Sequence, residues 1–177
     1  VITGGGSALM AAPAAMVSLA DLQATTDALL ASGATIDEIN AVRKHCSAIK
    51  GGWLAAAAQP ADIRSLVVSD VVGNDLATVA SGPLVGDPTT YADAREVLDR
   101  YDCDVPGAVI DHLDRGIAGE IRETPTTGDP VFTSVTTTII GDGRTTDEAA
   151  AARATEAGFD PVVLSSHIRG EARESAK

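Results

Sequence analysis

The chain has 177 residues, of which 45% are apolar and 3% aromatic, a composition that can form a packed core and argues against disorder. It carries 13 Lys and Arg against 25 Asp and Glu, a formal net charge of −12, so most of its surface should repel nucleic acid and anionic membranes. No apolar run approaches the roughly 18 residues that span a bilayer, and we expect neither a transmembrane helix nor a signal peptide.

The two cysteines, Cys46 and Cys103, have neither the spacing of a metal site nor that of a disulfide framework, which predicts a reduced, cytoplasmic setting. Acidic residues are in excess, and lysine is scarce beside arginine. This composition resembles that of proteins from salt-loving archaea, in which high ionic strength screens acidic self-repulsion.

The first predicted element is a strand end that leads into "GGGSALM". Gly4, Gly5, Gly6 and Ser7 are small enough for successive backbone N–H groups to converge on an anion, and a following helix would add its dipole. The stretch is neither a Rossmann G-x-G-x-x-G fingerprint nor a Walker loop. A tight strand-to-helix turn without a ligand is an equally good interpretation.

Two capping boxes predict the next two helices. Ser18 with Asp21 opens a helix that ends at Gly33, and Thr35 with Glu38 opens the helix that carries "NAVRKHCSAIKGGW".

Two stripes run along this second helix. The apolar positions, which should face a core, are Ile39, Val42, Cys46 and Ile49. The polar positions one residue later, which should lie at the rim of a cleft, are Asn40, Arg43, Ser47 and Lys50. Lys44 falls on the outer side, and His45 is interpreted as a surface residue. The alternative is a well-terminated helix whose last cations complement its dipole before Gly51 and Gly52.

A short apolar run, "IRSLVV", predicts a buried strand that begins at Ile63. Asp70 follows this strand and Asp75 follows a Gly-Asn turn, so both lie where parallel sheets place their ligand crevice. The two carboxylates could hold Mg²⁺, or one could accept a proton from a substrate hydroxyl. Alternatively, Asp70 forms an Asx turn and Asp75 begins a helix.

After the loop "SGPLVGDPTT", Thr90 predicts the cap of a helix, and Pro106 starts another that stops near Gly116. "VFTSVTTTIIG" then predicts a strand, followed by a helix capped by Thr145 and a further strand at "PVVLS". Strand, glycine turn, helix and strand in that order predict a βαβ unit. The expected fold class is therefore α/β, a Rossmann-like three-layer α/β/α arrangement with a mainly parallel sheet.

Five segments occur in the order found in one known family: "GGGSAL", "INAVRKHCSAIKGGWLA", "SDVVGNDLATVASGP", "DPTTYADA" and "RGEARE". From Val1 to Lys177 the chain resembles the glycerate 2-kinase family, ATP-dependent enzymes that are sometimes labelled hydroxypyruvate reductases. The resemblance implies a two-domain α/β enzyme that transfers the γ-phosphoryl group of ATP to the 2-hydroxyl of D-glycerate, giving 2-phosphoglycerate, with Mg²⁺. Its implied partners are glycerate and a nucleotide, with a homodimer as an assembly to test.

The resemblance also suggests roles for the candidate residues. Those implied in catalysis are Lys50, Arg43 and Asp70. Those implied in binding phosphate or substrate are Gly4, Gly5, Gly6, Ser7, Lys44, Ser47, Ser81 and Gly82. A metal ion would be held by Asp75 and Asp70, although which acid serves the metal and which acts as base stays open. The turn "GDGRTTDEA" is more acidic than expected at a nucleotide, which argues against Asp142 or Arg144.

Measured against the family, residues 1–177 would be an incomplete N-terminal α/β domain. An upstream segment with a lysine thought to face the cleft, and a C-terminal domain that forms the other wall, would be absent. We therefore expect the chain alone to hold half an active site and to be inactive. Two alternatives stay open: an NAD(P)H-dependent hydroxypyruvate reductase, although no G-x-G-x-x-G follows a strand, and a non-catalytic truncated remnant.

Overall fold

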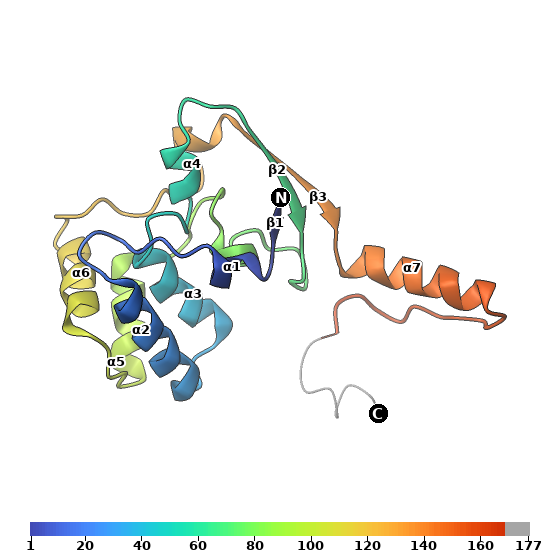
Figure 1. Ribbon diagram of the computed structural model, residues 1–177, viewed down its shortest axis with the longest axis horizontal. Coiled ribbons are helices and arrows are strands. Elements are labelled where there is room, and N and C mark those ends of the chain that lie inside the picture. The colour runs from blue at the N-terminus through green and yellow to red at the C-terminus, as the bar shows by residue number, and fades with distance from the viewer. Residues whose placement is uncertain (169–177) are drawn as a thin grey trace.

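The structure is a computed structural model that describes residues 1–168 (Figure 1). Within this range it contains seven α-helices, two short 3₁₀ turns and three strands. Their order is β1 (Ile2–Thr3), α1 (Gly6–Leu9), α2 (Leu19–Ser32), α3 (Ile36–His45), α4 (Trp53–Ala57), β2 (Ile63–Val68), η1 (Val79–Ser81), α5 (Tyr91–Arg100), α6 (Gly107–Ile117), η2 (Pro130–Phe132), β3 (Val135–Gly141) and α7 (Gly143–Glu156).

The three strands form a parallel sheet in the order β1-β2-β3. Thr3 pairs with Val68 and Val68 pairs with Gly141, so the carboxyl ends of three strands far apart in the sequence lie side by side. The turn after β1 and the loop after β2 therefore meet there, where parallel sheets place ligands. Figure 1 shows the sheet between a group of helices and the isolated α7. The predicted α/β class with a parallel sheet is confirmed.

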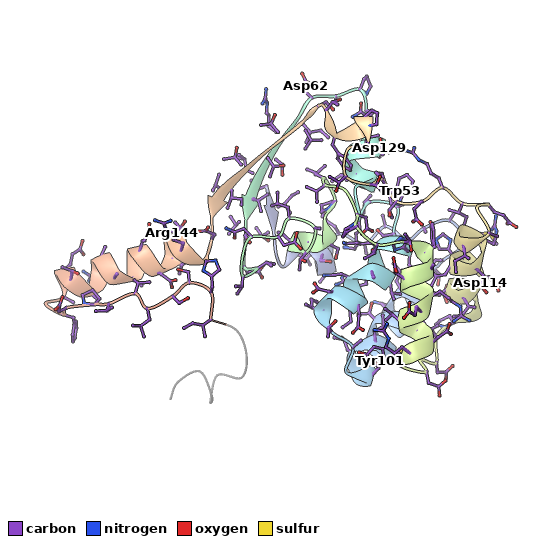
Figure 2. The ribbon with its side chains drawn as sticks, turned by 180° about the vertical axis from the view of Figure 1, so that it is seen from behind. Trp53, Asp62, Tyr101, Asp114, Asp129 and Arg144 are labelled. Carbon is purple, nitrogen blue, oxygen red and sulfur yellow. The ribbon has the colours of Figure 1, made fainter. Side chains whose placement is uncertain are left out.

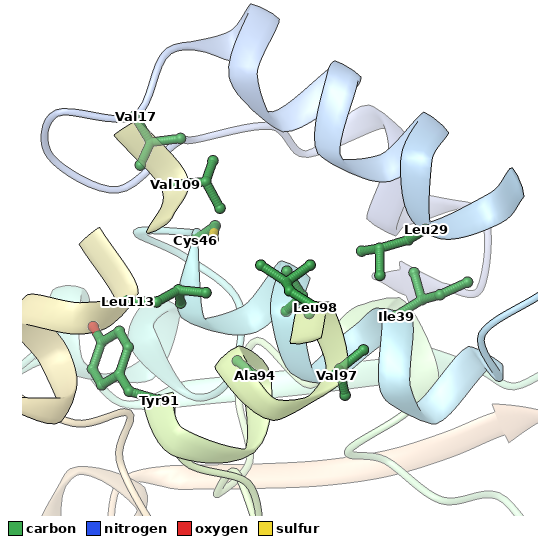
Figure 3. Close-up of a cluster of buried hydrophobic side chains, with 11 residues drawn as sticks. Val17, Leu29, Ile39, Cys46, Tyr91, Ala94, Val97, Leu98, Val109 and Leu113 are labelled. Atoms are coloured by element: carbon green, nitrogen blue, oxygen red, sulfur yellow. The ribbon is translucent and has the colours of Figure 1, made fainter. Parts of the chain in front are cut away.

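The main hydrophobic core lies among helices α2, α3, α5 and α6, beside the sheet (Figures 1 and 3). The apolar stripe predicted for α3 is buried here, with Val42 and Cys46 fully inaccessible and Ile39 only 5% exposed. Burial also raises the pKa of the Cys46 thiol to about 12, so this cysteine is a packing residue. The fully buried Leu98 and Leu113 come from α5 and α6 and close the core from the other side.

The predicted capping boxes are present. The Ser18 and Thr35 hydroxyls accept hydrogen bonds from the backbone N–H groups of Asp21 and Glu38, and each acid accepts a bond in return. A backbone hydrogen bond from Thr35, then bonds from Tyr101 and the Thr35 hydroxyl, lower the pKa of Glu38 to about 2. Helix starts were predictable because these contacts span only three residues.

Helix α3 differs from its prediction in two ways. It ends at His45, with Cys46 as its C-cap, so Ser47 and Lys50 lie in the turn that follows it rather than on the helix. Lys44 and His45 were predicted at the surface, and both predictions are wrong, since these residues are 5% and 1% exposed. Helix α5 and the polypeptide around Glu123 cover the side of α3 that was expected to face solvent.

The C-terminal part of the prediction also needs correction. Asp142 rather than Thr145 caps α7, because its carboxylate accepts a hydrogen bond from the Thr145 backbone at 2.9 Å. The strand predicted at residues 161–165 is not formed. This segment runs back along α7 and not along β3, so it lacks the neighbouring strand that a ladder requires (Figures 1 and 2). The "RGEARE" motif lies outside the described residues. None of the helices in residues 1–168 combines the length and apolarity needed to cross a membrane.

Candidate active site

A cavity of about 410 Å³ opens between α2, the turn that follows α3 and the segment Ser7–Ala12. Its polar wall contains Ser7, Arg43, Ser47 and Lys50, and its opposite wall includes Leu19, Leu22 and Gln23 from α2. The glycine turn and the basic stretch, 36 or more residues apart in the sequence, thus share one cavity.

The two cations of this wall converge on one residue of the glycine turn. The Lys50 ammonium donates to the Ser7 carbonyl at 2.7 Å and to the Ser7 hydroxyl at 3.0 Å. The Arg43 guanidinium donates to the same carbonyl at 3.2 Å. Neither cation forms a salt bridge with a carboxylate anywhere in residues 1–168. Two positive charges therefore sit side by side against a neutral acceptor.

Burial without a counter-charge changes the acidity of both groups. Desolvation, and then the repulsion of Arg43, lower the pKa of Lys50 to about 8. Burial also lowers the pKa of Arg43. Because the charged forms are disfavoured, an anion that enters the cavity would stabilise them and bind with the corresponding gain in free energy.

A strained backbone segment supports the other side of Ser7. Ala80, Ser81 and Gly82 have φ angles of 53°, 62° and 60°, the left-handed region, which non-glycine residues rarely adopt. The Ser81 hydroxyl lies 2.8 Å from the Ser7 hydroxyl and donates to the Asn40 side chain at 2.9 Å. Each such non-glycine residue costs about 1–3 kcal/mol, and such strain concentrates at functional sites.

Asp70 meets the opposite end of the glycine turn. A Cβ atom on Gly4 would lie 1.9 Å from Asp70 Oδ1, so a side chain at position 4 would displace the Asp70 carboxylate from its observed position. Asp70 is exposed and lines a second cavity, of about 660 Å³, together with Asp142 and Thr145 at the start of α7. The turn Gly4–Ser7 thus separates Asp70 on one side from Lys50 on the other.

Asp75 and Asp70 line different cavities. Asp75 lines a third cavity, of about 430 Å³, and its carboxylate accepts hydrogen bonds from the Ala77 backbone and the Thr78 hydroxyl. Among the described residues no group of three or more His, Cys, Asp or Glu side chains could hold a metal ion. Mg²⁺ often keeps one or two carboxylates and takes its remaining ligands from phosphates and water. Asp70 fits that limited role, whereas the Asp75 carboxylate accepts hydrogen bonds from the residues that follow it, as expected of the helix-starting acid in the alternative interpretation.

Lys44 does not line the cavity, although the resemblance implied a phosphate-binding role for it. Its ammonium donates to Asp87 Oδ1 at 3.2 Å in an ion pair whose side chains are 6% and 0% exposed. A Cβ on Gly51, which has φ +54°, would come within 2.9 Å of Asp87 Oδ2. The pair therefore packs directly beneath the turn that carries Lys50, and Lys44 has no free charge to offer a phosphate.

The remaining candidates shape the backbone around the cavity. The Ser47 hydroxyl donates to the Ala12 carbonyl and accepts from the Lys50 backbone, which fixes the turn around the cavity. Gly5 and Gly6 start α1, which has only four residues and so contributes little of the dipole expected there. The Gly82 carbonyl accepts the Gly52 N–H at 2.8 Å.

Sequence reasoning missed the contacts of three residues that hold α3 in place beside the site. Asn40 was seen only as part of a polar stripe. Asp87 stands in a D-P-T sequence that predicts a local turn, and it does accept from Thr89, but nothing marks its pairing with Lys44. Glu123 pairs with His45 at 2.9 Å across 78 residues without any sequence signal.

The comparisons with known proteins agree on one family. The family model described as a domain of unknown function, DUF4147, matches residues 1–114. The chain is 44% identical to "Glycerate 2-kinase" of Pyrococcus horikoshii over 99% of its length, and 45% identical to "Putative hydroxypyruvate reductase" of Agrobacterium vitis over 100%. A crystal structure of glycerate kinase from Thermotoga maritima matches 92% of the chain with a TM-score of 0.76 and 38% identity.

The chain spans 39% of the length of the first two relatives and 37% of the crystallised one. The matches nevertheless cover nearly all of its own sequence, which confirms the resemblance to the glycerate 2-kinase family drawn from the five motifs. Because the family model covers more than half of the 177 residues, the chain belongs to the DUF4147 family.

Proposed function

We propose that this chain forms one wall of the active site of an ATP-dependent D-glycerate 2-kinase. The reaction is transfer of the γ-phosphoryl group of ATP to the 2-hydroxyl of D-glycerate, giving 2-phosphoglycerate. The observation that carries the proposal is the convergence of Lys50 and Arg43 on the Ser7 carbonyl, without a carboxylate partner in the described residues, at the wall of a cavity. The names of the Pyrococcus and Thermotoga relatives support the same activity.

Phosphoryl transfer depends mainly on positioning and on charge neutralisation, which this wall can supply. Lys50 and Arg43 would neutralise a phosphate or carboxylate, with backbone N–H groups of Gly4, Gly5 and Gly6 as further donors. Ser7 and Ser47 would hold the cations and their turn in place, while Ser81 and Gly82 shape the floor. Lys44 would contribute only by supporting that turn through Asp87.

Asp70 is the acid best placed to serve a metal ion or to accept the hydroxyl proton. It is exposed at the carboxyl end of β2, directly over Gly4. Mg²⁺, when bound, would neutralise charge that develops on the phosphates. Asp75 stays a weaker metal candidate, because its carboxylate is already committed to Ala77 and Thr78.

We also propose that residues 1–177 are an N-terminal α/β portion of a two-domain enzyme, because they span about two fifths of the length of their relatives. A second wall would then come from the remainder of the protein, and the chain alone would be inactive. A cytoplasmic location, adaptation to high salt and a homodimer belong to the same proposal.

The test is ADP release with D-glycerate and ATP at molar KCl, from the 177-residue chain and from the chain extended by the flanking sequence of its reading frame. The extended protein should turn over and the shorter one should not. Lys50→Ala in the active protein should reduce kcat/KM at least about tenfold, because a buried cation that meets the phosphate is lost. Arg153→Ala, which removes an exposed cation from α7, is the matched control. Wild-type rates in Lys50→Ala would refute the role of Lys50.

The second candidate is reduction of hydroxypyruvate by NAD(P)H, which the names of two Agrobacterium vitis relatives favour. A decrease in nicotinamide absorbance with hydroxypyruvate, together with absence of ADP release, would replace the kinase proposal by this one. If the extended protein catalysed neither reaction, the non-catalytic remnant would be the interpretation that remains.

A further inference from the structure

Asn40 is a buried polar residue that the proposed chemistry does not use. It lies on α3 with 5% of its surface exposed, and its side-chain oxygen accepts a hydrogen bond from the Ser81 hydroxyl at 2.9 Å. Ser81 is itself only 1% exposed and is held in the left-handed conformation. A strained serine that points at a buried amide therefore joins α3 to η1 beneath the glycine turn.

The donors along this contact have a fixed order. Ser81 gives its single hydroxyl proton to Asn40, so in the 2.8 Å contact between the two serines the Ser7 hydroxyl must donate to the Ser81 oxygen. Ser7 then has only acceptor capacity left for Lys50, whose ammonium is an obligate donor at 3.0 Å. The hydrogen bonds run in one direction, from Lys50 through Ser7 and Ser81 to Asn40.

Such a chain strengthens each of its members, because every hydroxyl that donates becomes a better acceptor. Two of the three ammonium protons of Lys50 are used on the carbonyl and hydroxyl of Ser7. The third has no partner among residues 1–168 and is left for a ligand in the cavity. The position and direction of the ammonium group therefore depend on the far end of the chain.

We propose that Asn40 is a positioning residue, which orders the hydroxyl groups of Ser81 and Ser7 and thereby holds the ammonium group of Lys50 at the cavity wall. The importance of this for catalysis rests on the proposed function, whereas the physical coupling between Asn40 and Lys50 does not. Asn40 touches no ligand in this arrangement and acts only through the two serines.

The charges around Lys50 determine how its pKa should change when the hydrogen-bond chain to Asn40 is broken. Arg43 on α3 faces it and disfavours its charged form, and Asp27 on α2 is exposed on the opposite wall of the cavity. Burial and Arg43 already lower the pKa of Lys50 to about 8. Removal of the Asn40 oxygen weakens the acceptor at Ser7, so the pKa of Lys50 should fall further.

The decisive experiment is an NMR pH titration of the lysine ε-carbons in the full chain, in which the lysines are Lys44, Lys50 and Lys177. The Lys50 resonance is identified by its loss in Lys50→Arg. Asn40→Ala and Ser81→Ala break the same chain at different links, and both should lower the Lys50 midpoint by about half a pH unit or more. Asn40→Asp keeps an acceptor oxygen and adds negative charge, so it should restore or raise the midpoint.

A purely structural role of Asn40 would lower thermal stability without moving this midpoint. An unchanged midpoint in both folded alanine variants overturns the proposal, and if only one of them folds, that variant decides. A fall in Asn40→Ala that Asn40→Asp does not reverse overturns it as well. Glycerate phosphorylation by the extended protein is a separate readout: its absence, with the midpoint shift present, would refute the kinase and leave the coupling standing.

Discussion

The helical region and the arm formed by the sheet and α7 are built in different ways. Helices α2, α3, α5 and α6 surround a core in which Leu29, Val42 and Leu113 are inaccessible to solvent (Figure 3). Helix α7 has no buried residue, and Ile140 on β3 is 51% exposed. Figure 2 shows Arg144 at the beginning of this protruding helix, far from Tyr101 in the helical region. Extensive side-chain packing therefore holds the helical region, whereas the sheet has only a small buried cluster of Val67, Val79 and Ala80, and α7 adds no buried residue.

The candidate site lies where these regions meet, and each region gives it a different component. The cations come from α3 and the turn after it, which are fixed by burial and by the Lys44–Asp87 pair. Asp70 lies just beyond the carboxyl end of the central strand β2 and is exposed. Positive charge is thus held rigidly and with little solvent, whereas the acid remains accessible. Two comparisons of matched substitutions and one pH dependence test this difference, in order of decreasing effect.

The largest difference in the loss of unfolding free energy should come from two ion pairs, one in each region. Asp87→Ala leaves the Lys44 ammonium buried without its partner, and breaking a buried pair costs about 3–5 kcal/mol. Arg153→Ala removes a pair on α7 whose side chains are 79% and 67% exposed, worth about 0–1 kcal/mol. Unfolding in denaturant measures both.

Equal losses of stability in these two variants would contradict the comparison. Asp87→Asn refines the comparison, since the amide keeps the shape of the Asp87 side chain while removing its charge. Asp87 Oδ2 accepts no hydrogen bond within residues 1–168, so an amide at this position loses little beyond the ionic attraction. Its effect should lie between those of Asp87→Ala and Arg153→Ala.

A smaller difference in lost unfolding free energy is expected when one leucine in each region is replaced by alanine. Leu98 is 2% exposed in the helical core, and its replacement by alanine should cost about 2–5 kcal/mol of unfolding free energy. Leu66, on β2, is 40% exposed, so Leu66→Ala should cost much less, about 1 kcal/mol. Thermal unfolding of the two variants gives the comparison, and a Leu66→Ala effect as large as that of Leu98→Ala would show that the outer face of the sheet is packed in solution.

The same contrast explains which parts of the structure could be predicted from the sequence. The starts of α2, α3 and α5 depend on capping contacts over three residues, and all were predicted. The burial of Lys44 and His45 involves partners 43 and 78 residues away, which no local pattern reveals. The strand expected at residues 161–165 failed for a related reason, because a strand forms only where a neighbour offers its edge.

The candidate site was predictable to a similar extent. Its glycine turn and two of its cations were recognised, because their residue types are unusual in this acidic sequence. That Ser7 is the residue on which they converge was not predictable, because the contact joins segments 36 and 43 residues apart. That Asp70 and Asp75 line different cavities was equally hidden, since the four residues of loop between them can direct two carboxylates to one cavity or to two.

The smallest effect should appear in the pH dependence of stability. Burial raises the pKa of Glu123, but hydrogen bonds from His45 and from the backbone of Tyr91 and Thr124 outweigh it and leave the pKa below its usual value. A lowered pKa stabilises the folded state at pH values above the unfolded-state pKa, near 4, and this stabilisation disappears as the pH falls through the folded-state pKa.

Glu123→Gln removes the titrating group, so the free energy of unfolding should fall less steeply in acid than in the wild type. At neutral pH the loss should be no more than about 1 kcal/mol, because the side chain is 39% exposed and solvent screens the pair. Denaturant unfolding at several values between about pH 3 and pH 7 measures the two slopes. Parallel curves would show that the contact between Glu123 and His45 contributes no charge-dependent stability to the helical region.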